Sequence, residues 1–325
     1  MSSTSISAQQ QPTILTVGLE DAQSTDAEPS ALVPFSDSPV VSASAGASHT
    51  AAVTAAATLF TWGAGEHGQL GHGDTASNET PRLVRGLSGI PVCAVACGAR
   101  HTLALSVAGG VYAWGAAIFG ALGLGEDIGE EVLRPQAVRL PPAHPGSDEP
   151  AAAVAVSCGV HHSLTLTEAG GVLAWGWGRH GQVGDGSEGG HAFTPRVVRG
   201  LERCRVIAIS SGGHHNITRS ADGQCHTWGC GSSGQLGHGD AENRATPTVV
   251  AAVRVPVRVA AAGDRHTVVL TEDDQVPPSI LPLATSQQQA SQSSRAMWLN
   301  PTCLGRVADR TPLVPRVRSS DGVQG

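Results

Sequence analysis

Short apolar runs separated by glycine-containing turns fill the middle of the chain, and the second copy of the pattern shows this plainly. Residues 92–97 form an apolar run, residues 98–100 a turn and residues 101–105 a second apolar run. A third run, residues 111–114, follows a Gly-Gly pair, and residues 134–138 supply a fourth extended piece whose proline favours an edge strand. Four short strands joined by tight turns predict one blade of a β-propeller.

The same order of runs recurs along the chain. A histidine three residues after a glycine recurs at His49, His101, His162, His215 and His266. Thirteen residues after each of the first four histidines comes a Trp-Gly pair, at Trp62-Gly63, Trp114-Gly115, Trp175-Gly176 and Trp228-Gly229. The histidines lie 52, 61, 53 and 51 residues apart, a period typical of stacked or radially arranged units. The predicted fold is therefore all-β, a partial or small β-propeller of four-stranded blades.

These repeats divide the chain into three regions. We expect the propeller repeats over residues 40–275, with blades at about 40–91, 92–152, 153–204 and 205–256 and a partial blade at 257–275. The acidic, Ser-rich residues 1–39 are expected to be disordered. Residues 276–325 are expected to be disordered or to hold a disrupted fifth repeat. The longest interval between histidines places an insertion at residues 139–152, which we expect to be a surface loop.

The fifth unit lacks the second half of the pattern. Ser279 stands where a tryptophan is expected after His266, and the composition changes after Glu272. An open arc would leave apolar blade faces and strand edges exposed. Three explanations stay open: a smaller closed ring, an arc completed by another chain, or a truncated or altered reading frame. The abrupt change of composition favours the last.

Composition and charge argue against several classes of function. All 20 basic residues are arginine, and without lysine there is no Walker-type phosphate lysine and no Schiff base. A net charge of -7 without a basic run argues against direct binding of nucleic acid. The N-terminus lacks the features of a signal peptide, and no stretch approaches the length of a membrane span. We therefore expect a cytoplasmic or nuclear protein without membrane contact.

Several motifs that suggest ligand chemistry are better explained by the repeat. The spacing Gly63-x-Gly65-x-x-Gly68 matches a dinucleotide fingerprint, but it recurs in step with the repeat and does not open a helix. The pairs Cys93/Cys97 and Cys225/Cys230 lack the partners of a zinc site, so we expect buried thiols, no metal and no cofactor.

The recurrent histidines and tryptophans are expected to be structural. A propeller distributes successive histidines around a ring and does not bring them to one point, so we expect each imidazole to hydrogen-bond a turn carbonyl in its blade. The four tryptophans that end a strand ahead of a glycine loop are expected to pack between blades, together with their glycines. Trp177 is off this pattern, and its exposure is the one to check.

Residues 97–115 and 228–239 resemble the repeat of the regulator of chromosome condensation family, and the resemblance covers about 235 of the 325 residues. It implies a seven-bladed propeller. One founding activity of the family is nucleotide exchange on the small GTPase Ran, and many relatives use the propeller as a protein-binding platform, in ubiquitin ligases or in a plant ultraviolet-B photoreceptor. The photoreceptor has a Gly-Trp-Arg-His-Thr turn, whereas this chain has alanine at position 99 and Asp264 at the corresponding positions. The resemblance therefore implies no chromophore.

In the exchange factor, histidines and acidic residues on the face that carries the Gly-x-x-His turns contact the GTPase. By position, the resemblance assigns this role to His162, His215, Asp264, Arg265 and His266. We predict a regulatory, non-enzymatic module that binds a protein partner through these turns and the 139–152 loop. The alternative is a guanine-nucleotide exchange factor for a Ran-like small GTPase.

Overall fold

The structure is a computed structural model that describes residues 38–142, 149–187 and 189–273. Four sheets of four antiparallel strands follow one another along the chain, and a sheet of two strands comes last in the described part. This confirms the predicted all-β fold and its four-stranded blades. The regions for which we expected disorder, residues 1–39 and 276–325, lie outside the described residues except for 38 and 39.

Each blade takes four consecutive strands. The first is β1 (Val40–Ala45), β2 (His49–Thr54), β3 (Leu59–Gly63) and β4 (Asn78–Leu83). The second is β5 (Val92–Cys97), β6 (His101–Ser106), β7 (Val111–Ala116) and β8 (Glu131–Ala137). The third is β9 (Ala153–Cys158), β10 (His162–Thr167), β11 (Val172–Gly176) and β12 (Ala192–Val197). The fourth is β13 (Val206–Ser211), β14 (His215–Ser220), β15 (Cys225–Gly229) and β16 (Arg244–Val249). The partial fifth has β17 (Val257–Ala262) and β18 (Thr267–Thr271).

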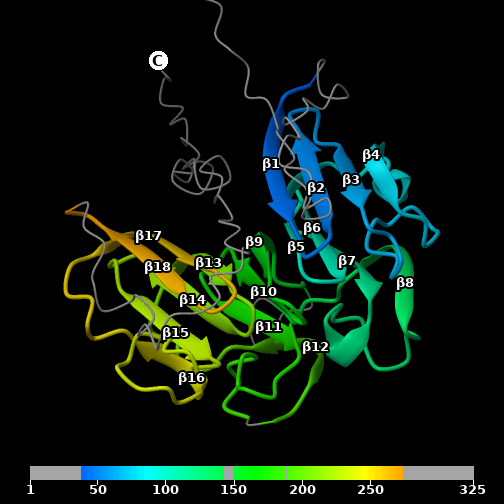
Figure 1. Cartoon of the computed structure of the whole chain (residues 1–325). Coiled ribbons are helices and arrows are strands. Elements are labelled where there is room, and N and C mark those ends of the chain that lie inside the picture. Colours follow the sequence, from blue (N-terminus) through cyan, green and yellow to red (C-terminus); the bar gives the residue numbers. More distant parts are fainter. Residues whose placement is uncertain (1–37, 143–148, 188, 274–325) are drawn as a thin grey trace, which may run out of the picture.

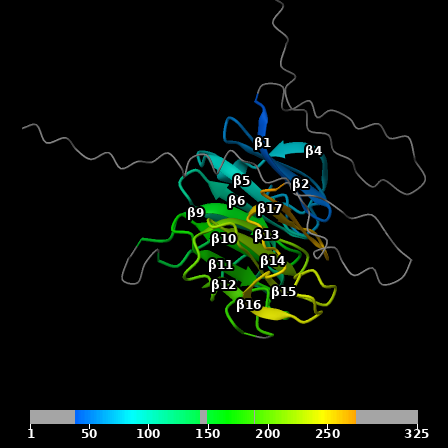
Figure 2. The same cartoon turned by 90° about the vertical axis from the view of Figure 1, so that its left-hand side faces the viewer.

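The blades stand side by side in an open arc (Figure 1). The first strands of successive blades, β1, β5, β9, β13 and β17, contact one another in chain order. In Figure 2 the third and fourth blades lie next to each other, each with its strands in chain order from the first to the last. The described residues therefore do not form the smaller closed ring that the repeat count left open.

Within the described residues, two short 3-10 helices lie in the connections between strands. η2 (Arg85–Leu87) follows the first blade, and η3 (Ile118–Gly120) lies in the loop between β7 and β8. No helix in the described part of the chain is long and apolar enough to cross a membrane. Residues 63–68, which carry the dinucleotide-like spacing, hold no helix, as the repeat-based interpretation of that spacing requires.

The thirteen-residue interval between each histidine and its tryptophan is the register of a β-hairpin. In the second blade His101 pairs with Gly115, and Thr102 pairs with Trp114, across β6 and β7. The other complete blades pair their histidine and glycine in the same way: His49 with Gly63, His162 with Gly176, and His215 with Gly229. The repeat in the sequence is therefore a repeat of strand register.

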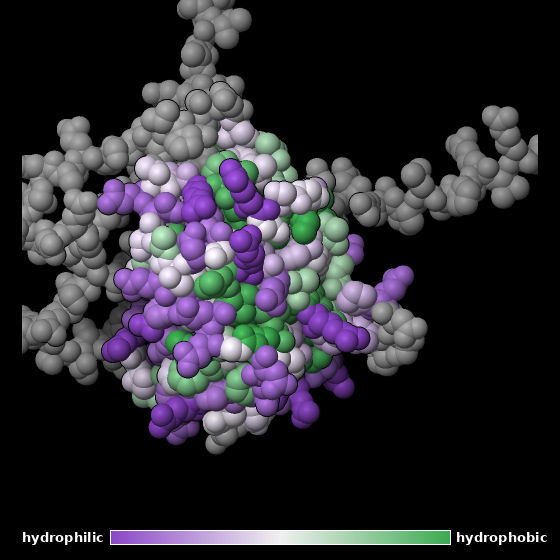
Figure 3. All heavy atoms as spheres, turned by 90° about the vertical axis from the view of Figure 1, so that its right-hand side faces the viewer, coloured by the Kyte–Doolittle hydropathy of each residue, from purple (hydrophilic) through white to green (hydrophobic). Residues whose placement is uncertain are grey.

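Burial follows the position of a strand within its blade. Every residue of β6 and β10 is buried, because a neighbouring blade covers each face of these central strands. The last strands are partly exposed, as β8 and β12 show, and each lies at the edge of its sheet as its proline suggested. Figure 3 looks onto the side of the arc where β4 and β8 lie and shows hydrophilic side chains around apolar ones.

The insertion expected at residues 139–152 is anchored at both ends. Leu140 is 6% exposed and belongs to the main hydrophobic core, and Pro142 bridges to Pro150. Residues 143–148 lie outside the described residues. On either side of that gap, Arg139, Pro142, Glu149 and Pro150 are exposed, whereas Leu140 and Ala151 are buried.

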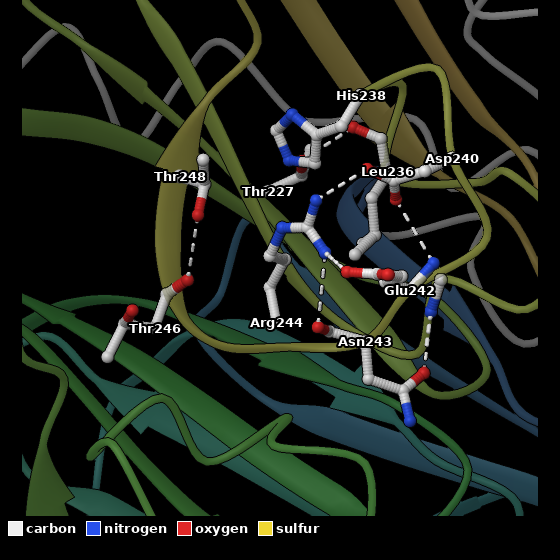
Figure 4. Close-up of polar contacts among 10 residues, drawn as sticks. Thr227, Leu236, His238, Asp240, Glu242, Asn243, Arg244, Thr246 and Thr248 are labelled. Atoms are coloured by element: carbon white, nitrogen blue, oxygen red, sulfur yellow. Dashed lines mark hydrogen bonds and ion pairs between the residues drawn. The ribbon is translucent and has the colours of Figure 1, made fainter.

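In the first and fourth blades, a threonine of the third strand holds the loop that follows the Trp-Gly pair. In the fourth blade the Thr227 hydroxyl donates to the carbonyl of Leu236 at 2.7 Å and lies 3.0 Å from His238 Nε2 (Figure 4). Nearby, Arg244 is paired with Asp240 at 2.6 Å. Thr61 makes the same bond to the carbonyl of Leu70 in the first blade. A threonine two residues after the start of strand three thus fixes the loop in both blades.

One glycine in this loop is required by the next blade. Gly71 has φ of +75°, and a Cβ built on it would lie 2.7 Å from the Trp114 Nε1. We expect Gly71→Ala to lower the free energy of unfolding by about 2–3 kcal/mol, since the methyl group meets both an unfavourable φ and the indole. Urea denaturation would measure the loss.

Gly89 is the matched control for this substitution. It has φ of +82°, but nothing lies within 4 Å of a Cβ built on it. Gly89→Ala should therefore show only the conformational cost of about 1 kcal/mol. Equal losses at the two positions would contradict the proposed contact between the loop and the tryptophan of the next blade.

Candidate protein-interaction face

The five Gly-x-x-His turns lie along one side of the arc, which we call the turn face. Hydrogen bonds join neighbouring turns, from Ala99 N to Val160 O at 3.3 Å and from Val160 N to Gly213 O at 3.1 Å. A further bond runs from Gly213 N to Gly263 O at 3.2 Å. The turns of the second to fifth blades therefore form one continuous backbone rim.

The histidine of each of the first four turns bonds to the next blade. Its Nε2 meets the side chain that directly follows the next histidine in the repeat. The four pairs are His49 with Thr102 at 2.8 Å, His101 with Ser163 at 3.0 Å, His162 with Asn216 at 2.8 Å, and His215 with Thr267 at 2.8 Å. Our expectation of a turn carbonyl as the partner was wrong, because these imidazoles point across the blade interface.

The partner side chain fixes the tautomer of the histidine. Thr102 donates its single hydroxyl proton to the carbonyl of Gln69 at 2.8 Å, so its oxygen is left to accept from His49 Nε2–H. Asn216 donates Nδ2–H to the carbonyl of Gln182 at 2.9 Å and accepts with Oδ1 from His162. Each of these histidines therefore donates through Nε2–H, and we call this arrangement the interblade clasp.

Three tryptophans donate to the same carbonyls as the side chains of the clasp. Trp114 Nε1 donates to the Gln69 carbonyl at 2.9 Å, and Trp175 Nε1 donates to the Ala121 carbonyl at 3.0 Å. Trp228 makes the equivalent bond to Gln182 O at 3.1 Å. These three rings are 0% exposed, so the expected packing of tryptophans between blades is confirmed for them.

Burial keeps the clasp histidines uncharged. Desolvation lowers the pKa of His49 and His162 to about 4 and the pKa of His101 and His215 to about 3. Neighbouring histidines lower the pKa of His101 and His215 further. A buried neutral imidazole whose Nε2–H is already committed has no proton chemistry to offer at neutral pH.

Three of the four cysteines in the two pairs are buried. Burial raises the pKa of Cys97 to about 12 and the pKa of Cys225 to about 11. Their partners differ, because Cys93 is only half-buried whereas Cys230 is buried. Among the residues that the structure describes, no three His, Cys, Asp or Glu side chains are grouped so that they could hold a metal ion.

The five residues proposed to contact a partner lie in different environments. His162 and His215 are 0% exposed and engaged in clasps. Asp264 and Arg265 are exposed and paired with each other at 3.7 Å, and His266 is half-buried. The residue directly before the histidine is exposed in the first, second and fifth turns and half-buried in the third and fourth. These residues are Ser48, Arg100, His161, His214 and Arg265.

A cluster of aromatic and histidine rings on the turn face extends this set. Trp177 lies 4.8 Å from His214, 5.3 Å from His180 and 5.8 Å from Phe119, measured between ring centroids. His161 is 6.0 Å from Trp177, and His191 is 4.9 Å from Phe119. Trp177 stood out in the sequence, but Phe119 and His191 did not, because neither belongs to the repeat.

Sequence comparisons agree with this architecture. The model of the RCC1-like domain matches residues 13–269. The human E3 ubiquitin-protein ligase HERC2 is 38% identical over 231 residues, which are 70% of this chain and 5% of that protein. The ultraviolet-B receptor UVR8 of Arabidopsis thaliana is 35% identical over 240 residues, which are 73% of this chain and 52% of the receptor. The chain thus spans a small part of HERC2 and about half of UVR8.

Solved structures show the same fold. Human WBSCR16 superposes with a TM-score of 0.69 at 24% identity, covering 79% of this chain and 64% of that one. Prp20p of Saccharomyces cerevisiae gives a TM-score of 0.64 at 23% identity, covering 76% and 60%. Blades, turns and tryptophans recur together along this chain, and the family match covers most of its length. The chain therefore belongs to the RCC1-like domain family.

Proposed function

We propose that the chain is a regulatory protein-interaction module that binds its partner on the turn face. One observation carries this proposal: the clasp repeats from blade to blade, but the residue directly before its histidine, which is exposed or half-buried, changes. Successive turns present Ser48, Arg100, His161, His214 and Arg265 on the same backbone rim. A constant framework with changing surface residues suits recognition, since loops on a rigid scaffold are common binding sites.

The candidate contact residues follow from this arrangement. Asp264, Arg265 and the exposed part of His266 remain candidates by position. His162 and His215 would support the surface from beneath, and the neighbouring His161 and His214 would make the contact. No covalent step is needed, so the proposal stays with a binding protein and not an enzyme.

Site-specific photo-crosslinking tests the proposal. Benzoylphenylalanine placed at Arg265 is expected to capture protein partners from cell extract. The same group at Val197, which is 57% exposed, should capture few, because Val197 pairs with Leu173 at the end of β12 that is opposite the turns. No crosslinks at either position, or equal yields from both, would contradict the proposal.

Guanine-nucleotide exchange on a small GTPase is the narrower form of the hypothesis. Prp20p is described by its binding to Gsp1p and histones, and its likeness to this chain concerns the fold. If the crosslinked partner is a small GTPase, accelerated release of fluorescent GDP, lost in Asp264→Ala with Arg265→Ala, would support exchange. Unchanged release would leave an interaction module without exchange activity.

A further inference from the structure

A row of four side chains crosses the turn face. The surface residues of the second to fifth turns are Arg100, His161, His214 and Arg265. The positive charge of Arg100 lowers the pKa of His161, and that of Arg265 lowers the pKa of His214. The neighbouring His214 also lowers the pKa of His161. The row therefore has an arginine at each end and two imidazoles between them.

Trp177 forms the centre of this row. Its ring is 4.8 Å from His214 and 6.0 Å from His161, with both pairs meeting edge to face. Phe119 stacks on Trp177 at 5.8 Å with an interplanar angle of 23°. We call the set Phe119, His161, Trp177, His180, His191 and His214 the aromatic–histidine surface.

Phe119 reaches this surface because its loop differs from those of the other blades. In the first, third and fourth blades a glutamine side chain accepts from the backbone N–H two residues before it: Gln69 from His67, Gln182 from His180 and Gln235 from Ser233. The second blade has Ala121 at this position and cannot make that bond. Phe119 instead takes φ of 58°.

This conformation exposes an aromatic ring at an energetic cost. A bulky residue in the left-handed region costs about 1–2 kcal/mol. The ring is nevertheless 40% exposed. At the same loop position His67 bonds Glu131 of the next blade at 3.0 Å, and His180 lies 3.4 Å from Asn243 of the next blade. Phe119 likewise contacts His191 of the next blade. This contact between blades explains why one edge of the ring is covered, but it does not explain why the rest of the ring is exposed.

The turns that border the surface carry Arg100 and Arg265 against Asp264, while the loop that carries Phe119 adds the exposed Glu126, Asp127 and Glu130. Burial lowers the pKa of His161 and His214, so both imidazoles are neutral at pH 7. Arg100, Arg179 and Arg265 are exposed, and only Asp264 opposes them on these turns. Along the turns, a chain with a net charge of -7 therefore presents an aromatic surface bordered by guanidinium groups.

We propose that the aromatic–histidine surface binds an extended acidic segment of a partner protein, with a large apolar side chain against Phe119 and Trp177. Carboxylates on either side of that anchor would pair with Arg100 and Arg265, because guanidinium groups bind carboxylates in a planar, bidentate fashion. An aromatic anchor with a charged rim is the usual anatomy of a binding hot spot. This inference rests on the proposed protein-interaction function and names the class of partner.

Selection from a random twelve-residue peptide library displayed on phage tests the inference. Peptides selected on the full chain are expected to share a central aromatic or large aliphatic residue with Asp or Glu on both sides. Affinities of the fluorescein-labelled peptides would then be measured by fluorescence anisotropy. A basic consensus would overturn the inference.

Two variants locate the binding site. Phe119→Gly removes the ring, yet glycine suits the left-handed φ, so the loop keeps its fold while the affinity falls at least tenfold. Arg265→Glu is expected to weaken binding at least tenfold and to reduce its dependence on salt. The matched controls Val197→Ala and Arg254→Glu, at exposed positions away from these turns, should change affinity less than twofold. Thermal melts confirm that each variant is folded.

The outcomes separate this inference from the broader function. If selected peptides bind and their affinity is unchanged in Phe119→Gly and Arg265→Glu, the module binds proteins elsewhere and only the inference fails. If neither peptides nor crosslinked partners are found, both fail. If light scattering shows a dimer that Phe119→Gly dissociates, the occupant is a second copy of the chain and the acidic-segment proposal is wrong.

Discussion

Lowering the pH from 7 to 5.5 is expected to reduce the free energy of unfolding by about 5 kcal/mol. The cause is the set of four clasp histidines, whose pKa burial lowers to about 3 or 4. In the unfolded chain each of them binds a proton near its ordinary pKa of about 6.5. The folded state therefore holds fewer protons, and acid favours unfolding.

The pH window follows from the same values. The clasp contributes its full stability above pH 6.5 and loses it as the pH falls toward 4, at about 1.4 kcal/mol per histidine and pH unit. Carboxylates with lowered pKa values, such as Asp185, titrate below this window. A loss of about 5 kcal/mol is a large share of a domain's stability.

Urea denaturation at pH 7 and pH 5.5 measures the effect. His101→Gln provides the internal check, since this variant is less stable at pH 7 but should lose about 1 kcal/mol less between the two pH values than the wild type. A wild-type loss below about 1 kcal/mol would show that the clasp histidines accept protons in the folded state, contrary to their buried, bonded geometry.

Trp175→Ala is expected to lower the free energy of unfolding by about 3–5 kcal/mol. The ring is 0% exposed, and its Nε1 donates to the Ala121 carbonyl of the preceding blade. Removing it opens a cavity at the interface of the second and third blades and leaves that carbonyl with only the Ser163 hydroxyl as donor. The melting temperature should fall by roughly 10–15 °C.

Trp177→Ala is the matched comparison, two residues along the same chain. Trp177 is half-buried on the turn face, so its loss should cost less than half as much stability while abolishing binding at the aromatic–histidine surface. Calorimetry on the two variants measures the difference. Equal destabilisation would mean that the off-pattern ring supports the fold as much as the repeated one does.

Periodicity alone predicted most of the framework. The interval from His101 to Trp114 corresponds to a hairpin register, and the strand beginning at Val92 ends at Cys97 as the apolar run indicated. What periodicity could not supply is the partner of each recurrent side chain. His101 meets Ser163, 62 residues away, and such a contact depends on how one blade packs against the next.

The binding surface was harder to predict because it departs from the repeat. Its signal was present in the sequence, since Ala121 stands where the other complete blades have Gln69, Gln182 and Gln235. The consequence, Phe119 in a left-handed conformation against Trp177, depends on the missing bond from glutamine to the backbone. The candidates chosen by position included His162 and His215, which lie beneath the surface, because position in a repeat does not distinguish a buried histidine from its more exposed neighbour.

We infer that the recurrent histidines hold neighbouring blades together, whereas the residues beside them bind the partner. Long-range nitrogen–proton NMR correlation on histidine side chains tests it most directly. We expect His49, His101, His162 and His215 to be neutral Nε2–H tautomers at pH 7 and to stay so until the protein unfolds in acid. Side chains protonated at Nδ1, or imidazoles that titrate near their ordinary pKa in the folded protein, would contradict it.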